Sequence, residues 1–383
     1  MSATEHVHKG LEGVIVDTTS ISLVDGEGGN LYYRGYPIES LVQHRFAEAL
    51  HLVVFGELPD SARLSQVEAY LHDAGRLPAQ VASALRGLAS SGAHPMASLQ
   101  GIAPLLAIDP PAHRLGRTAD EEEGLVVAAR IPAALAVINA ALAGRPDPEY
   151  PQSQRYGDRY LRLLTGRTPT AAAIDALEVM QILQLDHGFN ASTFTARVVT
   201  STLAPPASAL AAAMGALYGP LHGAADQGAL EMAIEVGDPA RASDFVRECL
   251  ATGRKVLGMG HREYRVVDPR AKILKAMAER TAQEPAHRQI LSTLLAVEAA
   301  FVEQTSAKRR ALRANLEFYK GVLCLALGIE KEYFTATFAA SRCFGWLAHA
   351  VEQRRDNRII RPAALYVGPT PRPTQPQAQA AVG

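Results

Sequence analysis

A histidine and three arginines follow two closely spaced glycines in the stretch GMGHREYRVVDPRA, residues 258–271. Histidine is the side chain best able to give or take a proton near neutral pH. Arginine pairs with carboxylate or phosphate through two charge-assisted hydrogen bonds, so Arg262, Arg265 and Arg270 together suit a small polyanion. Glycine weakens helices and strands and lets the backbone approach a ligand. The stretch predicts an anion site with acid–base chemistry, and the alternative is a solvated basic loop.

Three other segments combine polar side chains with glycine, proline or aromatic neighbours. His187 lies in DHGFN (186–190), His222 in GPLHGAADQ (219–227) and Glu317 in NLEFY (315–319). Each alone has a structural interpretation, respectively as a helix-terminal histidine, a packed turn residue and a solvated helix charge. Taken with residues 258–271, they favour acid–base chemistry on a small anionic substrate.

Several other kinds of site lack their motifs. The histidines do not have H-E-x-x-H spacing and the cysteines do not pair with them, so we expect no metal site. G-x-S-x-G is absent, which argues against a serine nucleophile. Glu263 stands where a dinucleotide-binding fingerprint needs its third glycine.

The composition excludes a global attraction to nucleic acid or an anionic membrane. The chain has 383 residues, 20% of them charged, and a net charge of -1. Cys249, Cys324 and Cys343 are odd in number and form no C-x-x-C, which favours a reducing compartment. The N-terminus lacks the apolar core of a signal peptide, and no uninterrupted apolar run approaches a membrane span. We therefore expect a cytoplasmic protein without nucleic-acid or membrane partners.

The elements that must position these residues are mostly helices. Short β-type runs occur at 13–16, 21–24 and 31–34, and the last two flank DGEGGN, which predicts a hairpin. Beyond Pro37, apolar residues recur at helical spacing, as at Ile290, Leu294, Val297 and Phe301. The pattern predicts an all-α protein with one small N-terminal hairpin and helices at 62–75, 79–90, 124–143, 171–186 and 289–302.

Two glycine- or asparagine-containing segments indicate domain boundaries. The glycine–proline pair at 219–220 and the NLEFYKG segment at 315–321 would bound a smaller lobe that can close over a substrate. The proline- and glutamine-rich end cannot build a core. We expect a large domain from 1–221 and 321–368, a small domain at 222–320 and a flexible tail at 369–383.

Eight segments, in chain order, resemble the citrate synthase family over about residues 11 to 368. They are LYYRGYPIESL (31–41), HPM (94–96), HGFNASTFTAR (187–197), GPLHG (219–223), GMGHREYRVVDPRA (258–271), NLEFY (315–319), SRCFGWLAHAVEQ (341–353) and RPAALYVG (361–368). The resemblance implies a mostly α-helical homodimer, with a large and a small domain that close over oxaloacetate.

The resemblance also implies a catalytic trio. His222 matches the histidine that hydrogen-bonds the thioester oxygen of acetyl-CoA, and Glu317 occupies the position of the base that removes the methyl proton. His261 matches the histidine that polarises and protonates the oxaloacetate carbonyl. Citryl-CoA is then hydrolysed to citrate and CoA.

Further residues match substrate contacts of the family. His187, Arg270 and Arg342 match oxaloacetate ligands, and Arg265 aligns with a contact to a CoA phosphate. Arg361 matches the arginine that reaches the site from the partner subunit. Acetyl-CoA acts as a co-substrate, and the resemblance implies no bound cofactor or metal.

The sequence departs from the family at four positions of the site. Glu317 is one methylene longer than the usual aspartate, although some members carry glutamate there. Ala224, Asp226 and Gln227 replace the more frequent glycine, asparagine and glutamate, which puts the rate in question more than the fold. Two alternatives stay open: 2-methylcitrate synthase acting on propionyl-CoA, and a non-catalytic paralogue that binds CoA or a dicarboxylate.

Overall fold

The computed structural model describes residues 7–112, 114–223, 225–261, 263–306 and 312–369, and of residues 225 and 226 only the backbone. The chain divides into two compact units, Thr19–Ile359 and the pair of segments Met1–Thr18 and Ile360–Gly383. The first unit contains all the long helices. The expected division at 222 and 320 stays a prediction, and most of the expected tail, 370–383, lies outside the described residues.

The predicted hairpin is the start of a three-stranded antiparallel sheet. Strand β1 (Ser22–Asp25) pairs with β2 (Asn30–Tyr33) in the register Ser22↔Tyr33, and β2 pairs with the short β3 (Tyr36–Pro37). Asp25 closes the turn, since its carboxylate accepts the Gly28 N–H at 2.8 Å and the Asn30 side-chain N–H at 2.9 Å. Sequence and structure agree here because turn residues fix the register of a hairpin.

The apolar run at 13–16 forms no strand. Val14, Ile15 and Val16 are exposed and irregular. A strand needs a partner for its backbone N–H and C=O groups, and in the described residues the sheet ends at β1.

Helices form nearly everything else, as predicted. Many begin at a residue whose side chain accepts a backbone N–H of the first turn, such as Asp60, Thr118 and Thr170. The α-helices up to residue 217 are α1 (Ile38–Leu41), α2 (Phe46–Phe55), α3 (Ser61–Ala74), α4 (Ala79–Ser90), α5 (Pro95–Ile102), α6 (Ala119–Leu142), α7 (Tyr156–Thr165), α8 (Ala171–Ile182), α9 (Ala191–Ser201) and α10 (Pro206–Leu217).

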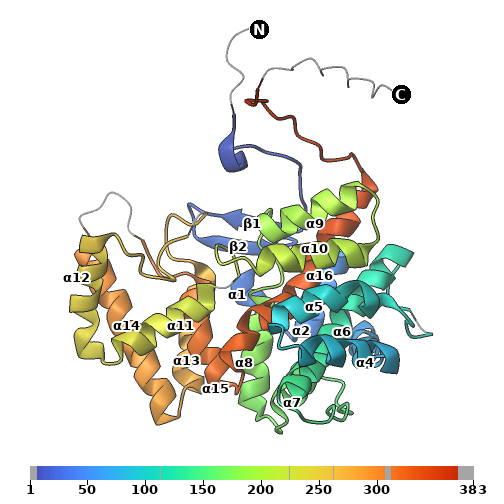
Figure 1. The fold of residues 1–383 in the computed structure, drawn as a ribbon, viewed down its shortest axis with the longest axis horizontal. Helices are drawn as coiled ribbons and strands as arrows, with labels where there is room; N and C mark the ends of the chain where they lie inside the picture. The colour runs from blue at the N-terminus through green and yellow to red at the C-terminus, as the bar shows by residue number, and fades with distance from the viewer. Residues whose placement is uncertain (1–6, 113, 224, 262, 307–311, 370–383) are drawn as a thin grey trace, which may run out of the picture. The chain divides into compact units, whose positions relative to one another are not determined.

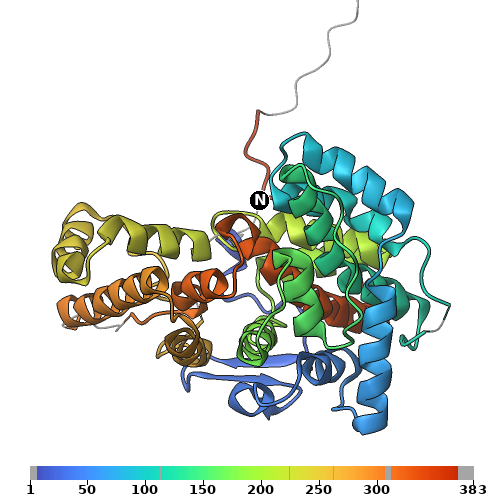
Figure 2. The same ribbon diagram turned by 90° about the horizontal axis from the view of Figure 1, so that it is seen from below.

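The chain beyond residue 217 contributes six more α-helices among the described residues. They are α11 (Ala225–Val236), α12 (Ala242–Thr252), α13 (Pro269–Thr281), α14 (Pro285–Gln304), α15 (Leu316–Ala326) and α16 (Phe334–Arg355). Short 3₁₀ turns occur at η1 (Lys9–Leu11), η2 (Ala103–Ala107), η3 (Pro239–Arg241) and η4 (Lys331–Tyr333). Helices α11 to α15 gather on one side of the larger unit, at the left of Figure 1, with α3 to α7 on the other side. Figure 2 shows the same grouping from below.

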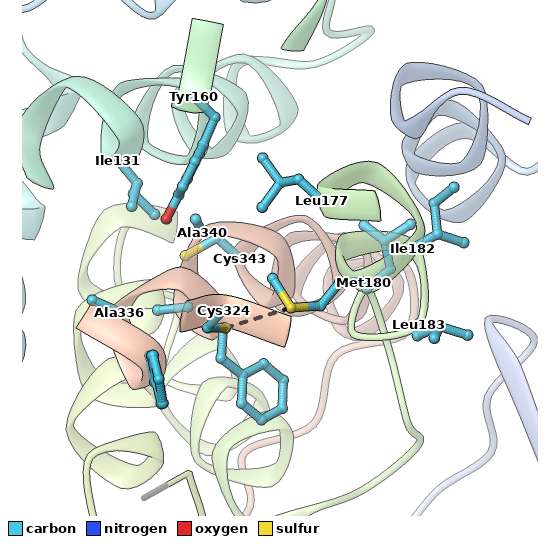
Figure 3. Packing of buried hydrophobic residues seen from close by; sticks show 14 of the residues in the cluster. Ile131, Tyr160, Leu177, Met180, Ile182, Leu183, Cys324, Ala336, Ala340 and Cys343 are labelled. Atoms are coloured by element: carbon cyan, nitrogen blue, oxygen red, sulfur yellow. Dashed lines mark hydrogen bonds between the residues drawn. The ribbon is translucent and has the colours of Figure 1, made fainter. Parts of the chain in front are cut away.

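Helix α16 is the buried centre of the larger unit. Ala336, Ala340 and Cys343 on α16 pack with Ile131 of α6, Tyr160 of α7, Leu177, Met180 and Ile182 of α8, and Cys324 of α15 (Figure 3). The Sγ of Cys324 lies 3.7 Å from the Sδ of Met180, and the hydroxyl of Tyr160 bonds to Thr337 at 2.9 Å. The many alanines of α16 let other helices approach it closely.

Helix α6 is, among the described residues, the one helix long and apolar enough to cross a membrane by length and composition. However, 89% of its most apolar window is buried inside the protein. Buried Arg130 interrupts the run and donates to backbone carbonyls of Ala74 and Leu106. The helix therefore has the character of a core helix.

Candidate active site

The glycines of residues 258–260 join the loop of His261 to the start of α15. Gly260 N donates to Arg313 O at 2.7 Å, and Asn315 N donates to Gly258 O at 2.9 Å. The Asn315 side chain adds a bond to Gly260 O at 2.9 Å and accepts the N–H of Glu317 at 3.0 Å, as the N-cap of α15. The segments that carry His261 and Glu317 are thus held together although they are far apart in the chain.

Both glycines are required for this pairing. Gly258 has φ +78° and Gly260 has φ +93°, conformations that favour glycine. A Cβ on Gly258 would lie 3.0 Å from the Cα of Phe318 and 2.8 Å from its ring. The predicted close approach of the glycine backbone is therefore to α15 itself.

His261, His187, Arg270 and Tyr264 form one cluster. The Nδ1 of His261 accepts the N–H groups of Glu263 at 3.0 Å and Tyr264 at 3.3 Å, which places the ring proton on Nε2. This Nε2 lies 3.3 Å from Nη2 of Arg270. Two N–H donors side by side favour an oxygen acceptor shared by both, such as a carbonyl or carboxylate.

His187 packs against His261 edge-on, with 5.2 Å between the ring centroids, and its Nε2 lies 3.2 Å from the hydroxyl of Tyr264. Burial, and then the nearby cations Arg270 and Arg342, hold the pKa of His187 well below its usual range. His187 is therefore a neutral ring that can exchange hydrogen bonds with a ligand without adding charge.

Arg270 is fixed at the start of α13 by Asp268. The Asp268 carboxylate accepts Nε of Arg270 at 3.0 Å and Nη2 at 2.9 Å, and it caps the helix through the Arg270 N–H. The same carboxylate accepts the N–H of Leu316 at 3.2 Å, so the N-termini of α13 and α15 adjoin. Burial opposes the charge of Arg270, but Asp268 outweighs it and raises the pKa of the guanidinium. Adjoining helix N-termini and a fixed cation favour anions.

His222 reaches the site from the loop between α10 and α11. Its Nε2 lies 2.8 Å from Oγ of Ser192, which accepts the indole N–H of Trp346 at 3.2 Å. Ser192 Oγ–H also donates to Oδ1 of Asn190 at 2.8 Å, an oxygen that accepts the N–H groups of Ser192 and Thr193 as well. The hydroxyl of Ser192 thus connects His222 to Asn190 and Trp346 and holds the imidazole ring in place.

Burial, and then the charge of Arg342, lowers the pKa of His222 to about 4. The ring is therefore neutral at pH 7, and a neutral imidazole keeps one N–H that can donate a hydrogen bond. A neutral donor suits an oxygen on which negative charge develops during a reaction.

Arg342 connects the parts of the site electrostatically. It is buried on α16, its Nε donates to Gln184 O at 2.6 Å, and its guanidinium lies 4.7 Å from the centre of the Phe338 ring. Burial lowers its pKa, whereas Asp186 and Glu317 are among the groups that raise it. Since its charge also acts on His222 and His187, the structure brings these predicted residues into one electrostatic neighbourhood.

Sequence reasoning missed the buried charges behind His187. Asp186 is fully buried and accepts His349 Nε2 at 3.1 Å, Ser22 Oγ at 2.5 Å and Gly188 N at 3.1 Å. His349 in turn accepts Nε of Arg197 at 3.0 Å. Burial opposes ionisation of Asp186, but His349 and then Arg342 lower its pKa to about 2. A signal was available, because Arg197 and His349 fall inside otherwise apolar or small-residue helical stretches.

The described contacts of this cluster do not include the other predicted positions. The side chain of Arg265 is about half exposed, and its Nε lies 3.8 Å from Oε1 of Glu27 in the β1–β2 turn. Arg361 is exposed and belongs to the unit that contains the chain termini. Arg262 and Ala224 lie outside the described residues, as does the side chain of Asp226, and Gln227 donates to Lys331 O at 2.7 Å.

The described residues contain no group of three or more histidine, cysteine, aspartate or glutamate side chains placed to hold a metal ion. The cluster instead combines a carboxylate, neutral imidazoles and guanidinium groups. This combination can bind a small anion and move protons next to it.

Comparison with known proteins gives one consistent result. Residues 10–363 match the family model described as citrate synthase, C-terminal domain. The chain is 33% identical to a citrate synthase of Deinococcus radiodurans over 365 residues, 95% of this chain and 96% of that protein. It is 34% identical to a 2-methylcitrate synthase of Mycobacterium tuberculosis, over 94% of this chain and 91% of that protein.

A solved structure of similar fold gives the same result. It is the citrate synthase of Thermoplasma acidophilum in a ternary complex with carboxymethyl coenzyme A and oxaloacetate. The TM-score is 0.89 at 30% sequence identity, and the match covers 98% of this chain and 99% of that chain.

Proposed function

The chain belongs to the citrate synthase family, and we propose on that basis that it condenses acetyl-CoA with oxaloacetate and hydrolyses citryl-CoA to citrate and CoA. It is an acyltransferase that converts the acyl group into an alkyl group on transfer. The observation that carries this proposal is the match, over 98% of the chain, to a citrate synthase bound to oxaloacetate and a CoA analogue.

We assign the proton transfers to three residues. Glu317 removes a methyl proton from the thioester, the ring N–H of His222 donates to the thioester oxygen as charge develops there, and Nε2–H of His261 donates to the oxaloacetate carbonyl. The tautomer of His261 that supports its role follows from the bonds to the backbone of residues 263 and 264. His187, Arg270 and Arg342 bind oxaloacetate.

The expected rate contributions indicate that the base and the hydrogen-bond donor act together. A thioester α-proton is too weakly acidic for a carboxylate acting alone, so the enolate oxygen needs a fixed donor. One such donor typically contributes about 3 kcal/mol, and a positioned general base contributes roughly 10²- to 10⁴-fold in rate. Both effects depend on excluding water, which closure of one lobe over the substrates would provide.

The remaining assignments concern CoA, the partner subunit and the cellular compartment. Arg265 contacts a phosphate of CoA, and its half-exposed side chain is accessible to a large ligand. The enzyme acts as a cytoplasmic homodimer in which Arg361 completes the site of the partner subunit. It uses acetyl-CoA as a co-substrate without a bound cofactor, and its reaction is the entry step of the tricarboxylic acid cycle.

A second candidate is 2-methylcitrate synthase, favoured by the similarity to such an enzyme at 34% identity. The two activities differ by one methyl group on the thioester, worth only about 1 to 3 kcal/mol in discrimination.

Release of free CoA thiol distinguishes these functions. Purified protein is mixed with oxaloacetate and either acetyl-CoA or propionyl-CoA, and the thiol is followed with a chromogenic disulfide. We expect faster release from acetyl-CoA, at least several-fold in kcat/KM. A preference for propionyl-CoA would assign 2-methylcitrate synthesis, and no release from either thioester would indicate a non-catalytic binding protein.

A further inference from the structure

A fully buried lysine lies one helical turn after Glu317. The side chain of Lys320 on α15 is 0% exposed, and its Nζ lies 3.9 Å from Oε2 of Glu317, whose own side chain is 14% exposed. Lysine is almost never fully buried without a compensating partner, because removing an ammonium group from water is costly. Packing alone therefore does not explain a buried ammonium group at this position.

The surroundings of Lys320 are suited to a charged amine. Its Nζ lies 4.5 Å from the centre of the Phe338 ring, and the Arg342 guanidinium lies 4.7 Å from the centre of the same ring. Cation–π contacts of this kind are strongest where water is excluded. The Phe338 ring of α16 thus contacts two cations, and one of them, Lys320, lies beside the carboxylate of Glu317.

The carboxylates on neighbouring helices have partners of their own. Asp268, before α13, accepts from the Arg270 side chain and from the N–H of Leu316. Glu298 on α14 accepts from Lys275 at 3.0 Å and also accepts the hydroxyl proton of Tyr319. Asp268 is thus paired with Arg270, and Glu298 with Lys275. Glu317 is the carboxylate that lies next to Lys320 on the same helix, α15.

Two described cations act on the Glu317 carboxylate. Arg342 approaches from α16 and Lys320 from the next turn of α15. Arg342 is also assigned to oxaloacetate, whereas no substrate contact is assigned to Lys320.

We propose that Lys320 is a positioning residue that keeps the Glu317 carboxylate ionised and oriented in the water-poor site. Burial favours the neutral form of a carboxyl group, and a cation about 4 Å away favours the ionised form. A base that is one methylene longer than aspartate also has one more rotatable bond, which an ammonium group on the same helix face restricts. This inference rests on the proposed role of Glu317 as the base.

The test is the pH dependence of kcat in Lys320→Met, which keeps most of the length of the side chain and removes its charge. Without the cation, Glu317 takes up a proton at higher pH. The acid-side fall of kcat is then expected to move upward by about one pH unit or more, while kcat at the alkaline plateau changes much less. Lys320→Gln provides a second neutral variant, and Lys320→Arg, which restores the charge, is expected to return the acid-side fall towards that of the wild type.

Lys331→Met is the matched control, since Lys331 is an exposed lysine paired with Glu231 at 3.0 Å. We expect its pH profile to overlay the wild type. Thermal unfolding and oxaloacetate binding are measured for every variant, so that loss of folding is separated from loss of charge.

Two outcomes distinguish this inference from the proposed function. If Lys320→Met or Lys320→Gln folds, binds oxaloacetate and shows an unmoved acid-side fall, or a uniform loss of kcat at all pH values, Lys320 is only a packing residue and the inference is wrong. If Glu317→Gln retains full turnover, the assigned base is wrong and the inference falls with it, whatever the lysine variants do.

Discussion

Glu317 lies on a helix and His222 lies in a loop, so different contacts position the two side chains. Glu317 belongs to the first turn of α15, where Asn315 caps the helix and accepts its N–H. His222 belongs to a loop, and its ring is oriented by the hydroxyl of Ser192. The proposed base is therefore fixed mainly by helix geometry, and the proposed donor by a chain of hydrogen bonds from α9 and α16.

Glu317→Gln tests the base at the scale of a single side chain. The amide keeps the size of the carboxylate but cannot accept a proton, so we expect kcat to fall roughly 10²- to 10⁴-fold. Oxaloacetate binding, measured by calorimetry without acyl-CoA, is expected to stay near the wild-type value, because oxaloacetate is assigned to other residues. Undiminished turnover would remove Glu317 from the mechanism.

At the scale of elements, the pairing of residues 258–260 with 313–315 connects the loop that carries His261 to the helix that carries Glu317. It consists of a single isolated bridge, Met259↔Ala314, with hydrogen bonds on both sides. Such a short pairing can position His261 relative to Glu317 because Gly258 allows the two backbones to approach closely.

Gly258→Ala tests this pairing. The new Cβ meets the backbone of Phe318 at 3.0 Å, and a non-glycine residue at positive φ costs about 1 to 2 kcal/mol. We expect lower thermal stability and a loss of kcat of roughly ten- to a hundredfold, since the start of α15 must shift.

Gly253→Ala is the control for that variant. Gly253 has φ +74°, and no atom of the described residues beyond its chain neighbours lies within 4 Å of the place that a Cβ would take, so this change carries the conformational cost without the clash. We expect reduced stability with nearly unchanged kcat. Equal losses of kcat in both variants would show that general destabilisation, not the contact with α15, is responsible.

At the scale of the whole molecule, the proposed function assigns residues of two chains to each site. The cluster of His187, His261 and Arg270 is complete within the unit Thr19–Ile359, whereas Arg361 belongs to the unit formed by the chain termini. If Arg361 serves the partner's site, one chain supplies the catalytic residues and the other supplies this arginine.

Mixing two inactive variants tests this arrangement. Arg361→Ala and Glu317→Gln are each expected to have low turnover, but a hybrid dimer contains one site with both residues intact. After dissociation and reassembly at equal amounts, random pairing is expected to recover about a quarter of wild-type activity. No recovery, with hybrid dimers verified by mass spectrometry, would place Arg361 in the site of its own chain or outside the site.

The sequence by itself determined the helical class, the N-terminal hairpin and the polar segments around His187, His222, His261 and Glu317. These features follow from local periodicity, turn residues and residue chemistry, which act over short distances along the chain. The failed strand at 13–16 shows the limit of such patterns, since a strand also requires a partner supplied by another segment.

Only the tertiary structure decided which polar side chains meet. The Asp186–His349–Arg197 chain, the contact of His222 with Ser192, and the buried Lys320 beside Glu317 all depend on contacts between segments distant in sequence or on burial within the folded core. Burial and neighbouring charge set protonation, and neither can be read from spacing alone, because both arise when separate helices exclude water from the same volume.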